Sequence, residues 1–461
     1  MSAFAFSRIP VAVPSVLTAN RSIQTRIPTP GTKEILESLD RLESRSMHGQ
    51  LPLVWERAED FSIYDASGNK WIDFTSTIFV ANIGHSNRRL LRGLQDCLEK
   101  PLVSCYAYAN KIRMEYLEKL IAFTDGQFEK AFLLSAGTEA TEAAFKLMRM
   151  QGAKVGKRKR GILCIEGNWH GRTLGAQMLS SNKNQKDWVG NLDPDIHHIP
   201  FPCPWDKTGE QGWSGFFKTN LERYCLENQL DGGRDFCGVM LETFQGWGAV
   251  FYPDAFVQEI HAWCRENNVL LAFDEMQAGF ARTGEKFGYR HYQVDPDLIC
   301  CGKGIGGGVP LSGVLGKAHI MDLPDVGNMS STHSANPLVC SAGLAVLEEI
   351  EKRDLVGESR RKGALMHGML NDLKLRHPGV VRFVSGKGMI AAVILQDRIK
   401  DKTGGLFGSM VAEKCMQKGL LVVHTGRESI KIGPPLTITD EALAEGISTL
   451  EEAIAEVYGN S

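Results

Sequence analysis

Between about residues 130 and 320, short apolar runs alternate with segments whose apolar positions repeat at helical spacing. Several of the short runs are apolar at every position, as expected of strands that helices cover on both faces. One longer segment carries a helical stripe that begins at Ala140, and another, opened by Pro253 and Asp254, is predicted to run as a helix to Asn268. The predicted strands are 131–134, 162–165, 236–241, 269–273, 298–301 and 311–315. This alternation predicts an α/β fold with a mostly parallel sheet.

The C-terminal third of the chain has a different pattern. It contains helical segments, strand-like stretches near 380–395 and 420–432, and a final helix from Asp440. We therefore predict a smaller α+β domain at 337–461 and a large domain at 76–336. Residues 1–75 are predicted to be an N-terminal arm and a segment that packs with the small domain.

Composition and charge narrow the class of partner. The chain has 461 residues, of which 43% are hydrophobic and 23% charged, with a formal net charge of -2. Neither half is a basic block, so the charge gives no reason to expect nucleic acid or a membrane surface as a partner. No run of eighteen or more uncharged apolar residues is present, so no membrane-spanning segment is predicted.

The cysteines and the first 33 residues bear on the compartment. The 11 cysteines form no CxxC pair, which fits reduced thiols in a cytoplasmic protein. Basic residues without an acid before Glu34 are typical of a transit peptide, but four prolines interrupt any long amphipathic helix there. We interpret the segment as an extended arm, with a mitochondrial transit sequence as the alternative.

Four candidate functional features directly follow predicted strands. They are Glu242, Asp274, Lys303 and the loop at 135–138. In sheets of this kind the ligand crevice lies beyond the carboxyl ends of the strands. We therefore expect these features to meet along one edge of the sheet. Asp274 alone could equally cap a turn.

Lys303 ends an apolar strand and precedes a glycine-rich loop, CGKGIGGGVPLSG. A lysine in such a place must be paired, solvated or used covalently, and the glycines permit close approach of a bulky group. The plain alternative is a loop lysine that reaches solvent. A nucleotide-binding P-loop is excluded because the order GxxxxGK[ST] is missing.

Two further loops are candidates for a phosphate seat and an aromatic face. Gly137 and Thr138 stand between a strand and a helix, where backbone amides bind phosphate, although a simple helix cap is the common reason for a threonine there. Trp169 and His170 follow the strand at 162–165, where a tryptophan could stack on a planar ring or pack in the core. A lysine, a carboxylate, a phosphate seat and an aromatic face are what pyridoxal 5'-phosphate requires.

The chain resembles the class III (ω-type) aminotransferases of pyridoxal-phosphate fold type I. The resemblance implies a large domain with a seven-stranded, mostly parallel sheet and a smaller α+β domain. The matching stretches are collinear and extend over nearly the whole chain. They are RIPTPGTKE, GNKWIDFTSTIFVANIGH, SAGTEATEAAFKLMR, GNWHGRTLG, LETFQGWG, LLAFDEMQAGFARTG, DLICCGKGIGGGVPLSG, SSTHSANPL, VSGKGMI and IKIGPPLTI.

The resemblance also implies roles for individual residues. Lys303 would form a Schiff base with the cofactor and carry the proton during transfer, and Asp274 would hold the pyridine nitrogen. Gln277 would bind the ring hydroxyl and Trp169 would stack on the ring. The remaining residues of the implied cofactor site are Gly137, Thr138, His170, Glu242 and Thr332, with Met276 beneath the ring. Thr332 would reach the phosphate from a second subunit, so a homodimer with a shared active site is implied.

The sequence departs from the family where the substrate carboxylate is usually bound. The usual second acid of EPxQGE is Trp247 here, and the usual arginine of IRxxPPL is Lys431. Lysine lacks the planar fork with which arginine holds a carboxylate. Lys431 or nearby Arg427 could still bind the same carboxylate, or the site could suit a substrate without one. By resemblance, the aromatic residues Trp55, Phe79, Tyr106 and Tyr108 lie near this pocket.

We therefore predict a pyridoxal-phosphate-dependent aminotransferase that works by two half-reactions. An amine or amino acid gives its amino group to the cofactor, and a keto or aldehyde substrate takes it. A long-chain amine or an amino sugar fits the departure at Trp247 and Lys431, and an amino-acid-type enzyme that uses 2-oxoglutarate is the alternative. A mutase, epimerase or decarboxylase on the same fold, or a silent binding protein, are the other readings.

Overall fold

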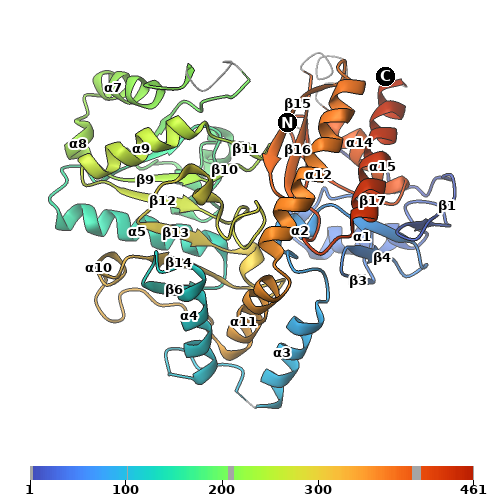
Figure 1. Cartoon of the computed structure of the whole chain (residues 1–461), viewed down its shortest axis with the longest axis horizontal. Helices are drawn as coiled ribbons and strands as arrows, with labels where there is room; N and C mark the ends of the chain where they lie inside the picture. The colour runs from blue at the N-terminus through green and yellow to red at the C-terminus, as the bar shows by residue number, and fades with distance from the viewer. Residues whose placement is uncertain (1–3, 101, 206–211, 397–405, 460–461) are drawn as a thin grey trace. The chain divides into compact units, whose positions relative to one another are not determined.

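The computed structural model describes residues 4–100, 102–205, 212–396 and 406–459, which form two compact units (Figure 1). Unit 1 consists of residues 1–87, 247–249 and 357–461, and unit 2 of residues 88–246 and 250–356. These units divide at 87/88 and 356/357, whereas the sequence placed divisions at 75/76 and 336/337. The division into an N-terminal arm, a large domain and a small domain stays a prediction.

Unit 2 is built on a seven-stranded sheet with the strand order β6-β14-β13-β12-β9-β7-β8. Strand β14 runs antiparallel to both neighbours, and the other adjacent pairs are parallel. The strands are β6 (Lys130–Leu134), β7 (Gly161–Ile165), β8 (Ile196–Ile199), β9 (Phe236–Glu242), β12 (Leu270–Asp274), β13 (Leu298–Cys301) and β14 (Ser312–Gly316). The mixed α/β sheet confirms the predicted fold class. Each predicted strand lies within one or two residues of its observed bounds, and β8 was missed.

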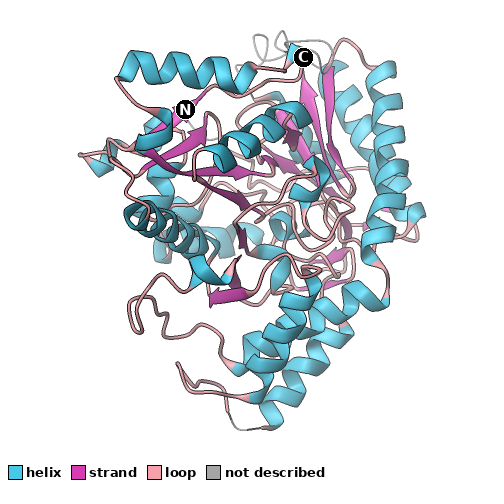
Figure 2. Ribbon diagram, turned by 60° about the vertical axis from the view of Figure 1, so that its left-hand side comes forward, coloured by secondary structure: helices cyan, strands magenta, loops and turns pink. Residues whose placement is uncertain are grey.

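Helices cover this sheet (Figure 2). Helix α5 (Gly137–Lys154) contains the apolar stripe that predicted a helix from Ala140 and continues beyond it. Helix α9 (Asp254–Glu266) begins directly after Pro253. The other elements of the unit are α3 (Arg88–Glu99), α4 (Lys111–Phe123), α6 (Leu174–Leu179), α7 (Phe216–Asn228), α8 (Gly232–Asp235), α10 (Ala318–Met321), α11 (Pro337–Lys352), the hairpin β10 (Phe244–Gln245) and β11 (Val250–Phe251), and the 3-10 turns η2 (Lys183–Gln185), η3 (Asp187–Val189), η5 (Gly288–Tyr292) and η6 (Lys303–Ile305).

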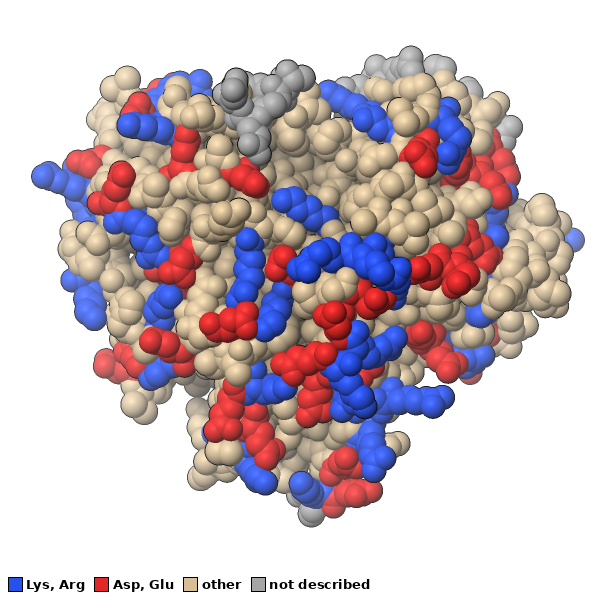
Figure 3. Space-filling view, in the orientation of Figure 1, with Lys and Arg blue, Asp and Glu red and all other residues tan. Residues whose placement is uncertain are grey.

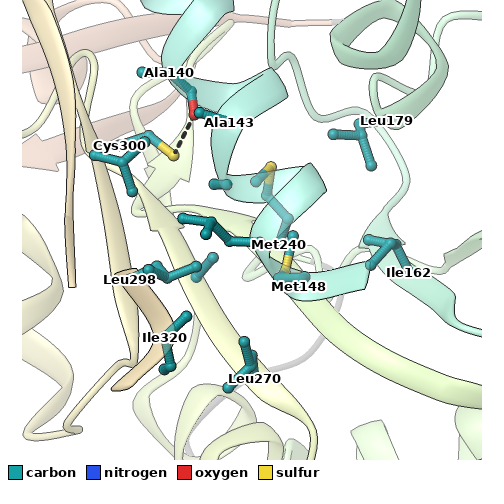
Figure 4. Close-up of a cluster of buried hydrophobic side chains, with 14 of the residues drawn as sticks. Ala140, Ala143, Met148, Ile162, Leu179, Met240, Leu270, Leu298, Cys300 and Ile320 are labelled. Carbon is teal, nitrogen blue, oxygen red and sulfur yellow. Dashed lines mark hydrogen bonds between the residues drawn. The ribbon is translucent and has the colours of Figure 1, made fainter. Parts of the chain in front are cut away.

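The core of unit 2 lies between α5 and the sheet. Apolar side chains from α5, including Ala140 and Met148, pack on Met240 and Leu298 of the strands below (Figure 4). Burying a Leu, Ile or Met side chain fully contributes about 1.5–3 kcal/mol, so this layer fixes the position of the first turn of α5 above the strand ends. The Cys300 thiol donates a hydrogen bond to the Ala140 carbonyl oxygen across the layer, at 3.6 Å.

Unit 1 contains two smaller sheets. One has the order β1-β2-β5-β4-β3 with β17 paired to β5, and the other has the order β15-β16-β19-β18. Its strands are β1 (Val16–Leu17), β2 (Ser22–Ile23), β3 (Arg57–Glu59), β4 (Ser62–Tyr64), β5 (Lys70–Asp73), β15 (Val381–Lys387), β16 (Ile390–Leu395), β17 (Leu420–Leu421), β18 (Val423–His424) and β19 (Ser429–Ile432). Its helices are α1 (Thr32–Leu42), the 3-10 turn η1 (Arg45–Met47), α12 (Leu355–Arg376), which begins at the boundary, α14 (Phe407–Gln417) and α15 (Asp440–Gly459).

The short element α2 (Ser76–Phe79) of unit 1 is a left-handed turn of non-glycine residues. Its φ angles run from 45° at Ser76 to 68° at Phe79. The Ser76 hydroxyl donates to the Gly433 carbonyl oxygen at 2.6 Å, and the Thr75 hydroxyl accepts from the Thr77 amide at 3.1 Å. These bonds compensate a backbone conformation that L-residues disfavour by roughly 1–2 kcal/mol each.

Charged side chains of both signs are interspersed over the face drawn in Figure 3. Among the described residues, no helix has the length and apolar character needed to span a bilayer.

Candidate active site

The carboxyl ends of the strands in unit 2 surround a cavity of about 200 Å³. Glu242 and Asp274 end the neighbouring strands β9 and β12 and stand in register with each other. Lys303 follows β13, and Gly137 and Thr138 open the helix after β6. The cavity is lined by Gly137, Thr138, Trp169, His170, Gly171, Glu242, Thr243, Phe244, Asp274, Met276, Gln277, Ala278 and Lys303. The predicted gathering of the strand-end residues along one edge is therefore observed.

Lys303 combines a desolvated amine with an unusual backbone. Burial lowers the pKa of Lys303, while the nearby charges of Asp274 and Glu242 act in the opposite direction. Its φ of 49° lies in the left-handed region, which is uncommon for a non-glycine residue and marks many functional sites. A lowered pKa increases the share of neutral amine, the nucleophilic form.

Asp274 lines the cavity and is held by two hydrogen bonds. Its Oδ2 lies 2.9 Å from His170 Nδ1, and its Oδ1 accepts from the Met276 amide at 3.0 Å. Asp274 is only 5% exposed and His170 only 3%. A buried carboxylate in this setting makes a strong charge-assisted hydrogen bond with any cationic partner in the cavity.

His170 is itself held by residues that the sequence analysis did not identify. Its backbone amide donates to the Ser180 hydroxyl at 2.8 Å, and its carbonyl oxygen accepts from the Thr141 hydroxyl at 2.8 Å. Asn168 Nδ2 lies 2.6 Å from the Nε2 atom of the ring. The stretch GNWHG was visible as a motif, but the direction of these contacts depends on how the loop after β7 folds back.

The first turn of α5 has the geometry of an anion site. The backbone N–H groups of a first helical turn have no partner within the helix, and the dipole favours negative charge there. Glu139 Oε2 accepts from the amides of Ser135 and Ala136, at 2.9 and 2.8 Å, and so caps the residues before Gly137. The Thr138 hydroxyl lies 2.6 Å from the Thr173 hydroxyl.

Glycines allow the loops to approach closely around the cavity. A Cβ at Gly171 would lie 2.3 Å from Thr138 Oγ1, and one at Gly246 would lie 2.2 Å from Gln277 Nε2. A Cβ at Gly302 would lie 2.4 Å from the sulfur of Met276. These positions exclude any larger residue without displacement of the lining side chains.

Trp169, in the loop after β7, and Glu242, at the end of β9, both line the cavity. Glu242 accepts from the Trp169 amide at 3.1 Å and from the Gly246 amide at 3.2 Å. The Trp169 side chain is 40% exposed, so it is not the core tryptophan that the plain interpretation would expect. The Arg172 guanidinium lies 4.3 Å from its ring centroid, a cation–π contact that the sequence analysis missed.

The five predicted substrate-binding residues lie in unit 1, and four of them form two cation–aromatic pairs. The Lys431 ammonium is 4.8 Å from the centroid of the Phe79 ring, and the Arg427 guanidinium is 5.0 Å from that of Trp247. Lys431 is 6% exposed and Phe79 1%. Trp55 is 38% exposed and packs edge-on to His85. Their role in substrate binding stays a prediction.

Three other predicted residues of unit 2 are exposed. Thr332 is exposed at the start of a turn at 332–335 and does not line the cavity of its own chain. Tyr106 and Tyr108 are 51% and 80% exposed. The suggested function of Thr332 toward a second subunit also stays a prediction.

Comparisons of the sequence and of the structure with known proteins agree on one family. A model of the class-III aminotransferases matches residues 44–454. A 4-aminobutyrate aminotransferase of Mycobacterium leprae is 30% identical over 455 residues, which cover 95% of this chain and 98% of the relative. A leucine/methionine racemase of Thermococcus litoralis is 30% identical over 435 residues, covering 92% and 96%. An amine transaminase from an uncultivated Pseudomonas species, solved in its PLP-bound form, has a TM-score of 0.81 and 25% identity and covers 90% of this chain and 97% of its own.

The lining of the cavity fits pyridoxal phosphate. Lys303 supplies the amine, Asp274 a buried carboxylate, the first turn of α5 an anion seat, and Trp169 a partly exposed aromatic face. When bound, this cofactor withdraws electrons from the substrate carbon and so makes its proton removable. The protein's own groups then determine orientation, charge and proton movement.

Proposed function

The chain belongs to the class-III aminotransferase family and is a pyridoxal-phosphate-dependent aminotransferase, and from this premise we propose that it acts on a primary amine without an α-carboxylate. A long-chain amine or an amino sugar has the required chemistry. A keto or aldehyde substrate accepts the amino group in the second half-reaction, which gives ping-pong kinetics.

We assign the chemical roles within the cavity as follows. Lys303 binds the cofactor covalently and moves the proton at the reacting carbon, and its lowered pKa favours the neutral, basic form. Asp274 keeps the cofactor's ring nitrogen protonated, while Gln277 orients the ring hydroxyl. Gly137 and Thr138 hold the phosphate at the start of α5. Trp169 would supply the aromatic face for the ring.

The observation that carries the substrate class is the pairing of Lys431 with Phe79. The Lys431 ammonium is almost buried and lies over an aromatic face, at 4.8 Å from its centroid. A desolvated cation–π contact stabilises the ammonium by up to about 2 kcal/mol, and a carboxylate that draws the lysine away must first replace that contact. The Arg427 guanidinium, which is exposed, also lies over an aromatic ring, that of Trp247, so both cations near the family's carboxylate position have aromatic partners.

A panel of half-reactions tests this proposal. Single amines and amino acids are added to the cofactor-loaded protein, and the loss of the cofactor's visible absorption is followed. We expect carboxylate-free amines to react fastest. If glutamate or alanine reacts fastest, the enzyme is of the amino-acid type and the proposed substrate class is wrong.

A double variant tests how Trp247 and Lys431 affect the substrate preference. Restoring the family pair, Trp247→Glu with Lys431→Arg, should raise the preference for glutamate by at least about tenfold, because arginine binds carboxylates bidentately. The control is Lys374→Arg with Trp188→Glu. Lys374 also lies over an aromatic ring, that of Phe383 at 5.7 Å, and Trp188 is an exposed tryptophan, so the same chemical changes occur elsewhere.

A racemase is the second candidate, because a relative that covers nearly the whole chain is a leucine/methionine racemase. A racemase or epimerase moves a proton but leaves the amino group on its carbon skeleton. A ¹⁵N-labelled amine and an unlabelled keto acceptor distinguish the two. Label in the acceptor's product supports the transferase, whereas label that stays on an inverted substrate supports the racemase. A decarboxylase would release carbon dioxide in the same assay.

We also propose a homodimer in a cytoplasmic, reducing environment. A stretch of unit 2 around 91–114 exposes large apolar side chains, and such surfaces usually mark interfaces. Its exposed members are Leu91, Leu98, Leu102, Val103, Tyr106, Tyr108 and Met114. No disulfide joins any of the 11 cysteines, all of which lie among the described residues, and this fits a reducing compartment.

A further inference from the structure

Three buried side chains form a line that ends at the carboxylate of the cavity. Asn168 Nδ2 lies 2.6 Å from His170 Nε2, and His170 Nδ1 lies 2.9 Å from Asp274 Oδ2. Each of the three is no more than 5% exposed. Asp274 lines the cavity, whereas Asn168 lies behind it and does not contact the space itself.

The direction of these bonds fixes the tautomer of His170. An amide nitrogen can only donate, so Nε2 must accept with its lone pair and carry no hydrogen. The ring hydrogen is then on Nδ1, from which it is donated to Asp274. His170 is therefore neutral, and Asp274 keeps its full negative charge.

The opposite orientation of the amide would have a different chemical result. It would place Oδ1 beside Nε2, which would then need a hydrogen, and His170 would become a cation hydrogen-bonded to Asp274. A cation there would neutralise the carboxylate and weaken its hold on a protonated ring nitrogen.

The other ionisable groups around His170 do not require a positive charge on its ring. His198 on β8 is neutral, because burial lowers its pKa to about 4, and its Nε2 lies 2.9 Å from the Leu179 carbonyl oxygen. Lys303 and Glu242 lie in the cavity, where Lys303 interacts with both Glu242 and Asp274. Asp274 is thus the charged group bonded directly to the ring.

We propose that Asn168 is a positioning residue that holds His170 in the neutral Nδ1–H tautomer and so preserves the full charge of Asp274 for the cofactor's ring nitrogen. The inference rests on the proposed function of Asp274. It adds a residue that touches neither cofactor nor substrate and acts through His170.

Nitrogen NMR of the full-length protein, labelled with ¹⁵N-histidine, tests the proposal. Protonated and unprotonated ring nitrogens resonate in well-separated regions, and His170→Gln identifies the His170 signals. We expect one protonated nitrogen, Nδ1, and one unprotonated nitrogen, Nε2, with and without bound pyridoxal phosphate. A spectrum with both nitrogens protonated, or with the hydrogen on Nε2, would overturn the proposal.

The variant Asn168→Asp reverses the polarity at Nε2. Its carboxylate accepts a hydrogen bond, so both nitrogens of His170 should become protonated, and pyridoxal phosphate should dissociate roughly tenfold faster because charge-assisted bonds are about twice as strong as neutral ones. The control Asn191→Asp makes the same change at an exposed position and should alter neither quantity.

A purely structural role for Asn168 would lower stability without changing the ring protonation, so an unchanged His170 spectrum in Asn168→Asp overturns the proposal. If that variant does not fold, Asn168→Ala serves instead. Removal of the donor should let hydrogen appear on Nε2, and an unchanged spectrum would again contradict the proposal. Since the spectra do not depend on turnover, an inactive enzyme with the expected tautomer contradicts only the proposed function.

Discussion

Lys303 shows how a single residue is prepared for chemistry. It holds a positive φ of 49° and a desolvated amine within reach of two carboxylates. A non-glycine residue in that conformation costs about 1–3 kcal/mol, which the surrounding strand ends must offset. The gain is an amine with a lowered pKa that points into the cavity rather than into solvent.

Replacing this amine should abolish turnover. Lys303→Ala removes the amine that we propose as covalent anchor and proton carrier, so we expect kcat to fall by at least about 10³-fold while the fold is kept. Steady-state assays and circular dichroism measure the two quantities. Lys317→Ala, on the surface of the same unit, is the control. Normal activity in Lys303→Ala would contradict the role in turnover that we propose for Lys303.

The elements after β6 and β7 depend on each other through Gly171. This glycine has a φ of 141°, and it allows the loop to pass within van der Waals contact of Thr138 in the first turn of α5. The helix start and the loop that carries Trp169 and His170 therefore form one wall. A glycine also permits close contact at the left-handed turn α2, where Phe79 packs against Gly433. A Cβ at Gly433 would lie 2.3 Å from the Phe79 ring.

Gly171→Ala should weaken cofactor binding. The added Cβ would lie 2.3 Å from Thr138 Oγ1, so the phosphate seat must shift, and we expect the Kd of pyridoxal phosphate to rise by about tenfold or more, as for a loss of about 1.4 kcal/mol. Fluorescence titration of the cofactor measures it. Gly190→Ala separates the causes, since Gly190 also has a positive φ but nothing within 4 Å of its Cβ position. An equal effect in both variants would show that backbone strain alone is responsible.

At the scale of the whole molecule, Glu275 ties together elements around the site without lining the cavity. It is fully buried behind Asp274 and accepts hydrogen bonds from the Thr243 hydroxyl and from the amides of Gly288 and Tyr289, the latter two at 2.8 Å. Burial nevertheless raises the pKa of Glu275 from 4.5 to about 7.

This shift should make stability fall as the pH rises from about 4.5 to about 7. In that window the unfolded chain loses the proton while the folded protein keeps it, so unfolding is favoured by up to about 3 kcal/mol at the upper end. Denaturant unfolding across this range measures the slope. Glu275→Gln should be less stable overall but should lack this component of the slope, whereas Glu227→Gln, exposed near the end of α7, should keep it. An unchanged slope in Glu275→Gln would contradict the prediction.

The shared phosphate site can be tested in mixed dimers. In a dimer of wild type with Lys303→Ala, only one site keeps the lysine, and under the proposed sharing that site receives Thr332 from the inactive chain. Adding Thr332→Ala to the inactive chain should accelerate cofactor loss from that site by roughly tenfold or more, since a hydrogen bond to a charged group is worth about 1.5–3 kcal/mol.

Ser330→Ala in the inactive chain is the control from the same loop. If Thr332→Ala has its effect only when it is placed in the active chain, each subunit supplies its own Thr332 and the shared site is wrong.

The sequence alone determined the sheet and the edge on which the site stands. Buried strands are continuous apolar runs, and in parallel sheets functional residues follow the strand ends, so the sequence placed Glu242, Asp274 and Lys303 together. The strand β8 was missed because it lies at the sheet edge and its letters IHHI contain two histidines.

Only the tertiary structure decided how side chains from separate loops meet. The amide of Asn168 beneath His170, the approach of Gly171 to Thr138, and the Lys431 ammonium over Phe79 depend on contacts a few ångströms long between segments that local pattern does not relate. Periodicity reports which face of an element is buried, because burial repeats with the element's own geometry. The direction of a hydrogen bond and the closeness of a contact depend on the folded positions of both partners. Only the tertiary structure brings these partners together, so the pattern of the sequence could not predict the contacts.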